Sequence, residues 1–401
     1  MQERSFEHFD ICIVGASIAG NYLTYLLSKS NLRIAVLEDH KKIGLPFQCA
    51  GIISQKLSQL IELPKEIVLN RVRTAKIVNP SGKSIKLFGD ENPYIIDRIA
   101  LDRLHYKKIK DNQNIMYYLG ERYKSFEYRI ENGKKYVLIE TSERKIKTRM
   151  LIGCDGPLSS VGKQLNVKND VLYASQIRTK ANFNEDEAAM YFDPQWKQLF
   201  GWIVPEGNQV FRIGIAAAKN VRNCFKRYLE KLDIDIDNKI DQQGGIIPYG
   251  IMNRVAFDNI LLLGDAAGQV KATTGGGIIM LLTAAKHASK CVNLCFKDGN
   301  FSKKFIKKNY EKPCSHTIGR ELKLHYLIRL VLAKFKDKDF EVFFKIIKEN
   351  KIERIISFYG DMDFPKTLVA KLLRNRTVLG FIFKFLVKNP VIIFKMLKLL
   401  F

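Results

Sequence analysis

The chain has 401 residues, of which 46% are hydrophobic and 27% charged, which excludes a disordered chain and predicts two or three folded domains. Lysine and arginine number 66 against 41 aspartate and glutamate residues, a formal net charge of +25. This excess predicts an anionic partner: nucleic acid, an anionic membrane surface or a phosphorylated substrate.

The N-terminal segment predicts a β-α-β unit. FDICIVG (9–15) has the pattern of a buried strand, SIAGNYLTYLLSKS that of a helix, and LRIAVLE, ending at Glu38, that of a second strand. The turn GASIAG places Gly15, Ser17 and Gly20 at the positions of a GxGxxG motif. A strand before it, a helix after it and an acid about 20 residues on are the context that a dinucleotide site requires.

Each position of this motif has a physical role. Gly15 permits a tight turn, a small Ser17 lets the backbone approach a pyrophosphate, and Gly20 lets the helix pack closely on the strand. Amides at the helix N-terminus, including that of Ala19, then hold the phosphates. Glu38 can accept hydrogen bonds from a ribose.

The next segment is a loop that contains a cysteine. GLPFQCAGIIS, from Gly44 to Ser54, is punctuated by glycine and proline around Cys49. The seven cysteines of the chain form no CxxC pair and are odd in number, which argues against a disulfide scaffold or a zinc ribbon. We expect no metal site and a reducing, cytoplasmic environment. By itself, Cys49 is either an inert buried thiol or part of a site.

The rest of the chain alternates between the two kinds of element. Residues 66–96 are β-rich, DRIALDRLHYKKIKD predicts a helix, and YVLIETSERKIKTRMLIGCDG predicts strands. A second β-rich stretch covers about 167–252. It is followed by the buried strand NILLLGD and by the helix GGGIIMLLTAAKHASKCVNLC. After about residue 300 the pattern is helical and rich in lysine to the end.

These elements predict an α/β fold with a Rossmann-like nucleotide-binding domain that other segments interrupt. The expected divisions are 1–165 (nucleotide-binding, first part, with the β-rich insertion at about 66–96), 166–252 (β-rich substrate domain), 253–298 (nucleotide-binding, last part) and 299–401 (helical, membrane-proximal).

Two further motifs follow buried strands. LIGCDGPLSS places Asp155 and Gly156 after one strand, and NILLLGDAAG places Asp265 after another. TTGGGIIM then opens a helix at Gly277 and Ile278. Each motif alone is no more than a turn, whereas their succession is specific.

In this order the motifs resemble those of FAD-dependent oxidoreductases of the aromatic-hydroxylase superfamily, over roughly residues 8–295. The resemblance implies bound FAD, with Glu38 on the adenosine ribose, Asp265 on the ribityl chain and Arg98 near the cofactor. It also implies that the helix after Gly277 points its N-terminus at the flavin, where a positive helix end stabilises the anionic reduced flavin.

Within that superfamily, PxxCxG (here Pro46, Cys49 and Gly51) resembles the geranylgeranyl reductases. The resemblance places Cys49 and Ala50 beside the cofactor. Reducing an isolated C=C bond needs a hydride and a proton. We therefore expect Cys49 to lie against the isoalloxazine and to take part in protonation.

A second feature of the same family is the segment FGWIVPEG, which implies that Trp202 and Pro205 line a lipid cavity. The implied function is an FAD-dependent reductase of geranylgeranyl chains on archaeal-type digeranylgeranylglycerophospholipids. The partners are then a prenyl lipid and an electron donor, left open among NAD(P)H, ferredoxin and another low-potential carrier.

The C-terminal tail predicts a membrane contact. No acidic residue follows Asp363, and eight lysines and arginines share this stretch with VLGFIF, VIIF and LKLLF. A last helix starting at Asn389-Pro390 would carry Lys395 and Lys398 on one side, which suits an interfacial helix on an anionic membrane. The alternative is a helix packed on the protein with its lysines in solvent. No run of apolar residues is long enough to predict a spanning helix, so we expect a peripheral protein.

Three other functions stay open. The first is reduction of another prenyl lipid such as a quinone tail. The second is a flavin monooxygenase, against which PxxCxG and GWxxP weigh. The third is a basic nucleic-acid-binding or scaffold protein with a degenerate flavin fold. No helix-turn-helix, zinc finger or RNA-binding motif is visible, so we expect no nucleic-acid partner.

Overall fold

In the computed structural model, which describes residues 5–89, 91–252 and 254–400, the N-terminal β-α-β unit forms as the sequence predicts. β2 (Ile11–Val14) and β3 (Ile34–Glu38) pair in parallel and are connected by α1 (Ile18–Leu27). Every residue of β2 is buried, as expected for a parallel strand covered on both faces.

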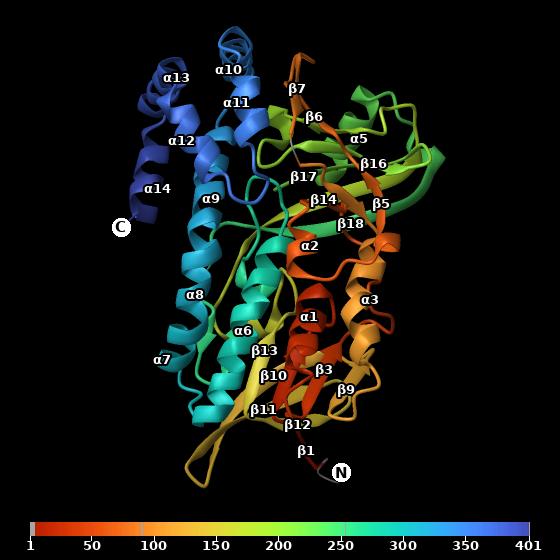
Figure 1. Ribbon diagram of the computed structural model, residues 1–401, viewed down its shortest axis with the longest axis vertical. Helices are drawn as coiled ribbons and strands as arrows, with labels where there is room; N and C mark the ends of the chain where they lie inside the picture. Colours follow the sequence, from red (N-terminus) through yellow and green to blue (C-terminus); the bar gives the residue numbers. More distant parts are fainter. Residues whose placement is uncertain (1–4, 90, 253, 401) are drawn as a thin grey trace.

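This unit belongs to a six-stranded sheet with the order β19-β20-β13-β2-β3-β9. The added strands are β9 (Ile115–Leu119), β13 (Met150–Gly153), β19 (Ala256–Phe257) and β20 (Ile260–Leu262). All pairings are parallel except that of β19 with β20. Helix α1 packs between α3 (Arg98–Ile109) and α6 (Ile278–Asp298) on this sheet (Figure 1). The Rossmann-like domain interrupted in sequence is confirmed.

Two smaller sheets flank this core. The first holds β1 (Glu7–His8), β10 (Tyr123–Glu131), β11 (Lys134–Thr141) and β12 (Lys145–Thr148), near the N-terminal end of the molecule (Figure 1). The second holds β4 (Ile52–Ile53), β5 (Val68–Arg71) and β8 (Tyr94–Ile96), and the short helices α2 (Leu57–Leu60) and α4 (Ser160–Gln164) complete this half.

The β-rich part is a seven-stranded sheet with the order β18-β14-β17-β16-β15-β6-β7. Its strands are β6 (Thr74–Val78), β7 (Ser84–Phe88), β14 (Asp170–Lys180), β15 (Glu187–Tyr191), β16 (Gly201–Gly207), β17 (Val210–Ala217) and β18 (Lys239–Tyr249), with α5 (Val221–Lys231) packed on it. The predicted insertion at 66–96 therefore supplies two strands to this seven-stranded sheet. Parallel pairing of β6 with β15 joins these distant stretches.

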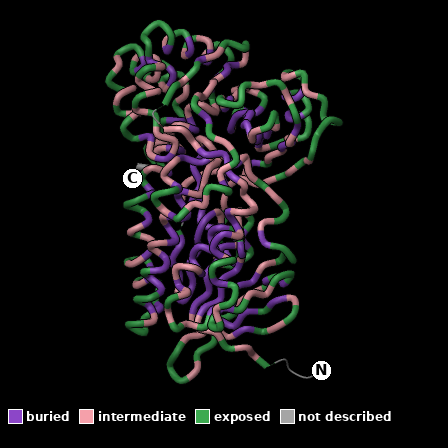
Figure 2. Tube along the Cα trace, turned by 45° about the vertical axis from the view of Figure 1, so that its right-hand side comes forward, coloured by how far each residue is buried: buried purple, intermediate pink, exposed green. Residues whose placement is uncertain are grey.

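The C-terminal part is helical to its end, as the sequence predicts. Its helices are α7 (Lys303–Ile306), α8 (Lys312–Cys314), α9 (Arg320–Leu332), α10 (Asp337–Glu349), α11 (Ile352–Tyr359), α12 (Lys366–Arg374), α13 (Arg376–Val387) and α14 (Pro390–Leu400). Figure 2 shows burial concentrated along the six-stranded sheet, whereas the last helices are largely exposed or intermediate.

Within the described residues, no single helix is long and apolar enough to cross a membrane. One pair of helices, Arg376–Val387 and Pro390–Lys398, meets that criterion of length and composition when the two are taken together. The chain bends by 98° between them.

A buried ion pair connects this helical part to the nucleotide-binding part. Lys271 Nζ lies 2.6 Å from Asp363 Oδ1, with side-chain exposures of 7% and 1%. Ser54 donates a hydrogen bond of 2.6 Å to the other Asp363 oxygen, and His325 Nε2 lies 3.0 Å from the Asp363 carbonyl. Segments far apart in sequence are thus fixed around one carboxylate.

We predict that Asp363→Ala lowers the free energy of unfolding by about 3–5 kcal/mol, because it leaves the buried Lys271 charge without its counter-ion. Urea denaturation measures this loss. As a control, Glu349→Ala removes an exposed pair with Lys345 and changes stability by less than about 1 kcal/mol. Equal effects of the two substitutions would contradict the prediction.

Candidate functional site

One cavity of about 1050 Å³ runs from the carboxyl ends of the parallel strands onto the seven-stranded sheet. Most residues predicted for the site line it, namely Gly15, Ser17, Ala19, Glu38, Cys49, Ala50, Arg98, Asp155, Gly156, Trp202, Asp265, Gly277 and Ile278. The fold thus brings three distant motifs and the cysteine loop to one place, as parallel strands predict for a ligand site at their carboxyl edge.

Two predicted residues do not line the cavity. Gly20 lies one position too far along α1, and a Cβ there would stand 1.9 Å from the Gly15 carbonyl oxygen. Its role is the close packing of helix on strand that the sequence suggested. Pro205 is the second: side chains alternate along β16, so Trp202 and Val204 line the cavity, and the substrate contact of Pro205 stays a prediction.

The glycine turn is held by an acid from the next strand. Gly15 has φ +102°, and a Cβ on it would approach the Cys154 carbonyl oxygen to 2.4 Å, so only glycine fits. Glu38 Oε2 accepts a hydrogen bond of 2.8 Å from the Ala16 amide. Glu38 therefore fixes the turn as well as lining the predicted ribose position.

The sequence analysis did not predict Asp102, a residue of α3 whose buried side chain lies beside the first turn of α1. Its Oδ1 accepts hydrogen bonds from the Ile18 amide at 2.7 Å and from the Ser17 hydroxyl at 2.9 Å. Arg98 lies 2.6 Å from the same oxygen. Burial lowers the pKa of Arg98, but Asp102 together with the other acidic groups nearby outweighs this effect and holds the pKa above its ordinary value. The sequence signal that could have identified Asp102 is its position four residues after Arg98, one helical turn along α3.

The two strand-end aspartates differ in their surroundings. Asp155 accepts hydrogen bonds from Ser159 Oγ at 2.5 Å and from the Val161 amide at 3.1 Å, so its carboxylate caps α4. Burial raises its pKa, with these donors opposing. Burial also raises the pKa of Asp265 to about 6, with Arg98 opposing. No described residue donates a hydrogen bond to the Asp265 carboxylate, which faces the cavity.

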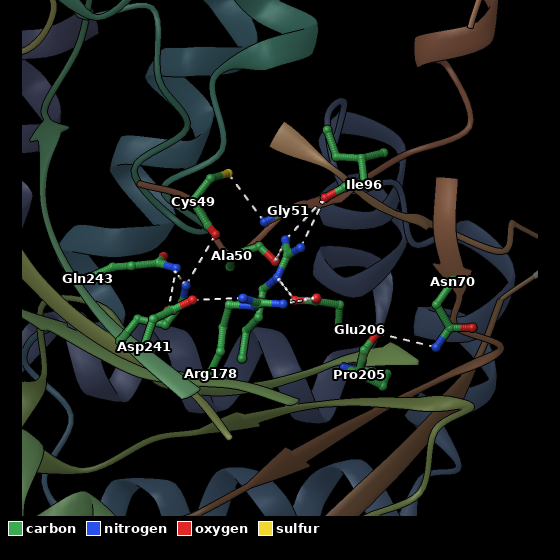
Figure 3. A network of polar contacts seen from close by, with 12 residues as sticks. Cys49, Ala50, Gly51, Asn70, Ile96, Arg178, Pro205, Glu206, Asp241 and Gln243 are labelled. Carbon is green, nitrogen blue, oxygen red and sulfur yellow. Dashed lines mark hydrogen bonds and ion pairs between the residues drawn. The ribbon is translucent and has the colours of Figure 1, made fainter. Parts of the chain in front are cut away.

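Cys49 is the one cysteine of the seven that is not buried. The Gly51 amide donates to its Sγ at 3.3 Å, and its carbonyl accepts from Gln176 Nε2 at 3.2 Å (Figure 3). Arg212 donates to the Ala50 carbonyl at 3.1 Å. Gln176 and Arg212 come from the seven-stranded sheet, and neither was predicted as a site residue, because the pairing of this loop with that sheet is not local in sequence.

Beyond Cys49 most side chains of the cavity wall are apolar, although polar ones such as Arg73, Gln176 and Gln243 also line it. The apolar side chains there are Val72, Ala174, Ala188, Ala189, Met190, Leu199, Phe200, Trp202, Val204 and Ile247 from the β-rich part and Ile356 and Leu368 from the C-terminal helices. An apolar wall with few polar groups selects a hydrophobic ligand.

The solved structures that resemble this fold define its class. A p-nitrophenol 4-monooxygenase of Pseudomonas putida matches with a TM-score of 0.68 at 14% identity, covering 93% of this chain and 99% of that one. A halogenase in complex with FAD matches with a TM-score of 0.63 at 12% identity, covering 92% and 87%. The chain has the fold of the FAD-dependent oxidoreductases.

More specific similarities point to one group within this class. A geranylgeranyl bacteriochlorophyll reductase-like protein of Thermoplasma acidophilum has a TM-score of 0.77 at 20% identity, covering 98% of this chain and all of that one. Digeranylgeranylglycerophospholipid reductase 1 of Methanococcoides burtonii is 27% identical over 93% of this chain and 94% of its own length. The chain is thus a homologue of the digeranylgeranylglycerophospholipid reductases, and the resemblance inferred from the motifs is confirmed.

Not every comparison is informative about activity. An uncharacterised protein of Methanocaldococcus jannaschii is 26% identical over 93% of this chain and 97% of its own length. No family model matches the sequence.

The cavity fits FAD, the cofactor of this class. The backbone at Gly15 is open to a pyrophosphate, and the carboxylates of Glu38 and Asp265 line the cavity where the motifs predict contacts with the ribose and the ribityl chain. The α6 N-terminus, at Gly277, lines the cavity with no side chain on its capping residue. Helix amides there favour negative charge.

We predict that Asp265 makes the apoprotein less stable as pH rises from about 4 to 6. Its pKa is higher in the folded protein, so the unfolded chain loses this proton first and stability falls. Asp265→Asn removes the effect and raises the free energy of unfolding by about 1–3 kcal/mol at pH 8, with no gain at pH 4. Urea denaturation of apoprotein at both pH values tests this; an equal gain at both would contradict it.

Proposed function

We propose that this chain is an FAD-dependent reductase that saturates C=C bonds of geranylgeranyl chains on archaeal-type digeranylgeranylglycerophospholipids. The observation that carries the proposal is one cavity with the glycine and acid motifs at one end and an apolar wall at the other. Its volume of about 1050 Å³ lies at the upper end of the roughly 300–1,000 Å³ range of small-molecule pockets. The named relatives support this substrate class.

The chemistry divides between cofactor and protein. When bound and reduced, FAD supplies a hydride. The apolar wall around Trp202 holds the prenyl chain and excludes water. Cys49 supplies the proton: its S–H bond breaks as a C–H bond forms at the other carbon of the double bond, and water then returns a proton to the thiolate. Each saturated bond therefore consumes one hydride and one proton.

The direct test is anaerobic. Protein reduced with dithionite is mixed with a digeranylgeranyl phospholipid in detergent, and the product mass is followed. Stepwise gain of two hydrogens per double bond supports the proposal. An unchanged lipid together with reduction of a prenylated quinone would favour the alternative substrate. Oxygen-dependent addition of an oxygen atom would identify a monooxygenase.

We predict that Cys49→Ala retains FAD absorbance but lowers kcat by about 100-fold or more, since a positioned proton donor contributes about that much. Cys49→Ser replaces the thiol with a far weaker acid, so its kcat should lie between those of Cys49→Ala and the unmodified protein. The matched control is Cys224→Ala on α5, which leaves turnover near that of the unmodified protein. Full turnover by Cys49→Ala would rule out the thiol as the donor.

We further propose that the last two helices dock on the cytoplasmic face of an anionic membrane. On α13, Leu379, Phe383 and Val387 stand four residues apart and are 48–66% exposed. On α14, Val391 and Phe394 are 61% and 70% exposed. The opposite face is packed: Val378, Phe385 and Ile392 are buried in a cluster with the other C-terminal helices.

Charge and position support this docking. The exposed lysines and arginines beside the apolar stripe are Arg376, Lys384, Lys388, Lys395 and Lys398. Basic side chains around an apolar face bind anionic lipid surfaces. The neighbouring helices α11 and α12 line the cavity through Ile356 and Leu368. Docking of this part would bring the cavity wall close to the lipid that supplies the substrate.

We predict that Phe383→Ser combined with Phe394→Ser reduces flotation with phosphatidylglycerol vesicles at least tenfold, because two large apolar side chains no longer enter the bilayer. The control is Ile130→Ser, which changes a 71% exposed residue on β10, at the opposite end of the molecule (Figure 1). Equal flotation of the double variant and the control would exclude this surface as the docking site.

A further inference from the structure

Two side chains of the seven-stranded sheet hold the backbone on both sides of the Cys49 peptide. We propose that Gln176 and Arg212 are positioning residues that fix the thiol of Cys49 at the junction between the cofactor end and the apolar end of the cavity. This inference deepens the proposed function and rests on the role of Cys49 in it.

Gln176 makes three side-chain hydrogen bonds from a buried position on β14. Its Nε2 donates to the Cys49 carbonyl at 3.2 Å and to Gln243 Oε1 at 2.8 Å. Its Oε1 accepts from Trp202 Nε1 at 2.7 Å. One amide thus connects the cysteine loop with an indole of the apolar wall, so a ligand that moves Trp202 acts directly on the peptide of Cys49.

Arg212 holds the residues that follow. Arg212 is 2% exposed. Its guanidinium donates hydrogen bonds to the Ala50 carbonyl at 3.1 Å and to the carbonyl of Ile96, a residue of β8, at 3.2 Å (Figure 3). It also lies over the Phe47 ring, 5.0 Å from its centroid. A Cβ on Gly51 would stand 1.9 Å from Arg212 Nη1, so the glycine of the PxxCxG pattern is the residue that admits this guanidinium.

An ion-pair network fixes Arg212 in turn. Arg212 Nε lies 2.8 Å from Glu206, which also pairs with Arg178, and Arg178 pairs with Asp241 at 2.7 Å. Figure 3 shows Asp241, Arg178 and Glu206 lying in a row below the loop. Two positive and two negative charges balance, so the network adds no net charge beside the thiol. Its effect on Cys49 is therefore geometric.

The test uses the thiol itself as a probe. Cys49 is the one cysteine that is not buried, so its alkylation by iodoacetamide can be followed by peptide mass spectrometry in the purified holoenzyme. Gln176→Met keeps the length of the side chain and loses all three hydrogen bonds. We expect alkylation of Cys49 to accelerate about three- to tenfold, the change that loss of a hydrogen bond predicts.

Arg212→Lys is an independent second variant. Lysine keeps the charge that pairs with Glu206, but a single ammonium cannot reproduce the planar fork that reaches two carbonyls and stacks on Phe47. We expect the same acceleration of alkylation. In the reductase assay both variants lower kcat. Arg212→Lys leaves KM unchanged, since Arg212 has no bond to the apolar wall, whereas Gln176→Met also loses the bond to Trp202.

The matched control is Thr179→Val, also on β14 and buried. It loses a hydrogen bond to the Asn238 carbonyl, away from the cysteine loop. It should alkylate within twofold of the unmodified protein. Thermal unfolding of all variants separates a local change at Cys49 from a general loss of stability.

Each outcome has one meaning. Unchanged alkylation in both Gln176→Met and Arg212→Lys overturns the positioning role, even where the reductase is active. Acceleration equal to that of Thr179→Val overturns it too, because general loosening then explains the change. Acceleration confined to the two variants supports it. If the unmodified protein then reduces no prenyl lipid, the proposed function fails while the positioning of the thiol stands.

Discussion

The parallel pairing of β13 between β2 and β20 is the constraint on which the site depends. Gly153 pairs with Val14 on one side and with Leu262 on the other. The turns that follow these strands therefore meet at one edge, although they are far apart in sequence. Each turn brings a glycine or a carboxylate to that edge, and the missing Cβ of Gly15 and Gly20 lets strand and helix approach closely enough to form it.

The cavity exists because a second sheet faces this edge. The seven-stranded sheet contributes the apolar wall on one set of alternate residues, while the other set, including Ile203, packs with α5. The same sheet sends Gln176 and Arg212 to the loop of Cys49. The C-terminal helices close the far side, and the buried Lys271–Asp363 pair joins them to the segment before α6. The strand-end motifs, the apolar wall and the C-terminal helices thus form one connected unit.

Much of the fold and part of the site follow from the sequence. Buried apolar runs and helical periodicity predict β2, α1, β3, α3, β20 and α6, because these patterns reflect local structure. Most residues of the glycine and acid motifs line the cavity for the same reason. Resemblance to a motif does not say which face of a strand its residues occupy, so it could not show that Trp202 lines the cavity and Pro205 does not. Asp102 was missed because its partners, Ser17 and Ile18, lie more than 80 residues away.

The sequence alone establishes the local features: the tight turn at Gly15, the helix that starts at Ile278, the loop around Cys49 and the basic apolar tail. These depend on neighbours a few residues apart. Only the tertiary structure decided that residues 74–88 share a sheet with residues 170–249, that Arg212 fills the space left by Gly51, and that α13 has both a packed face and an exposed apolar face. Such contacts are set by the geometry of sheets and helices packing together, which no short stretch of sequence encodes.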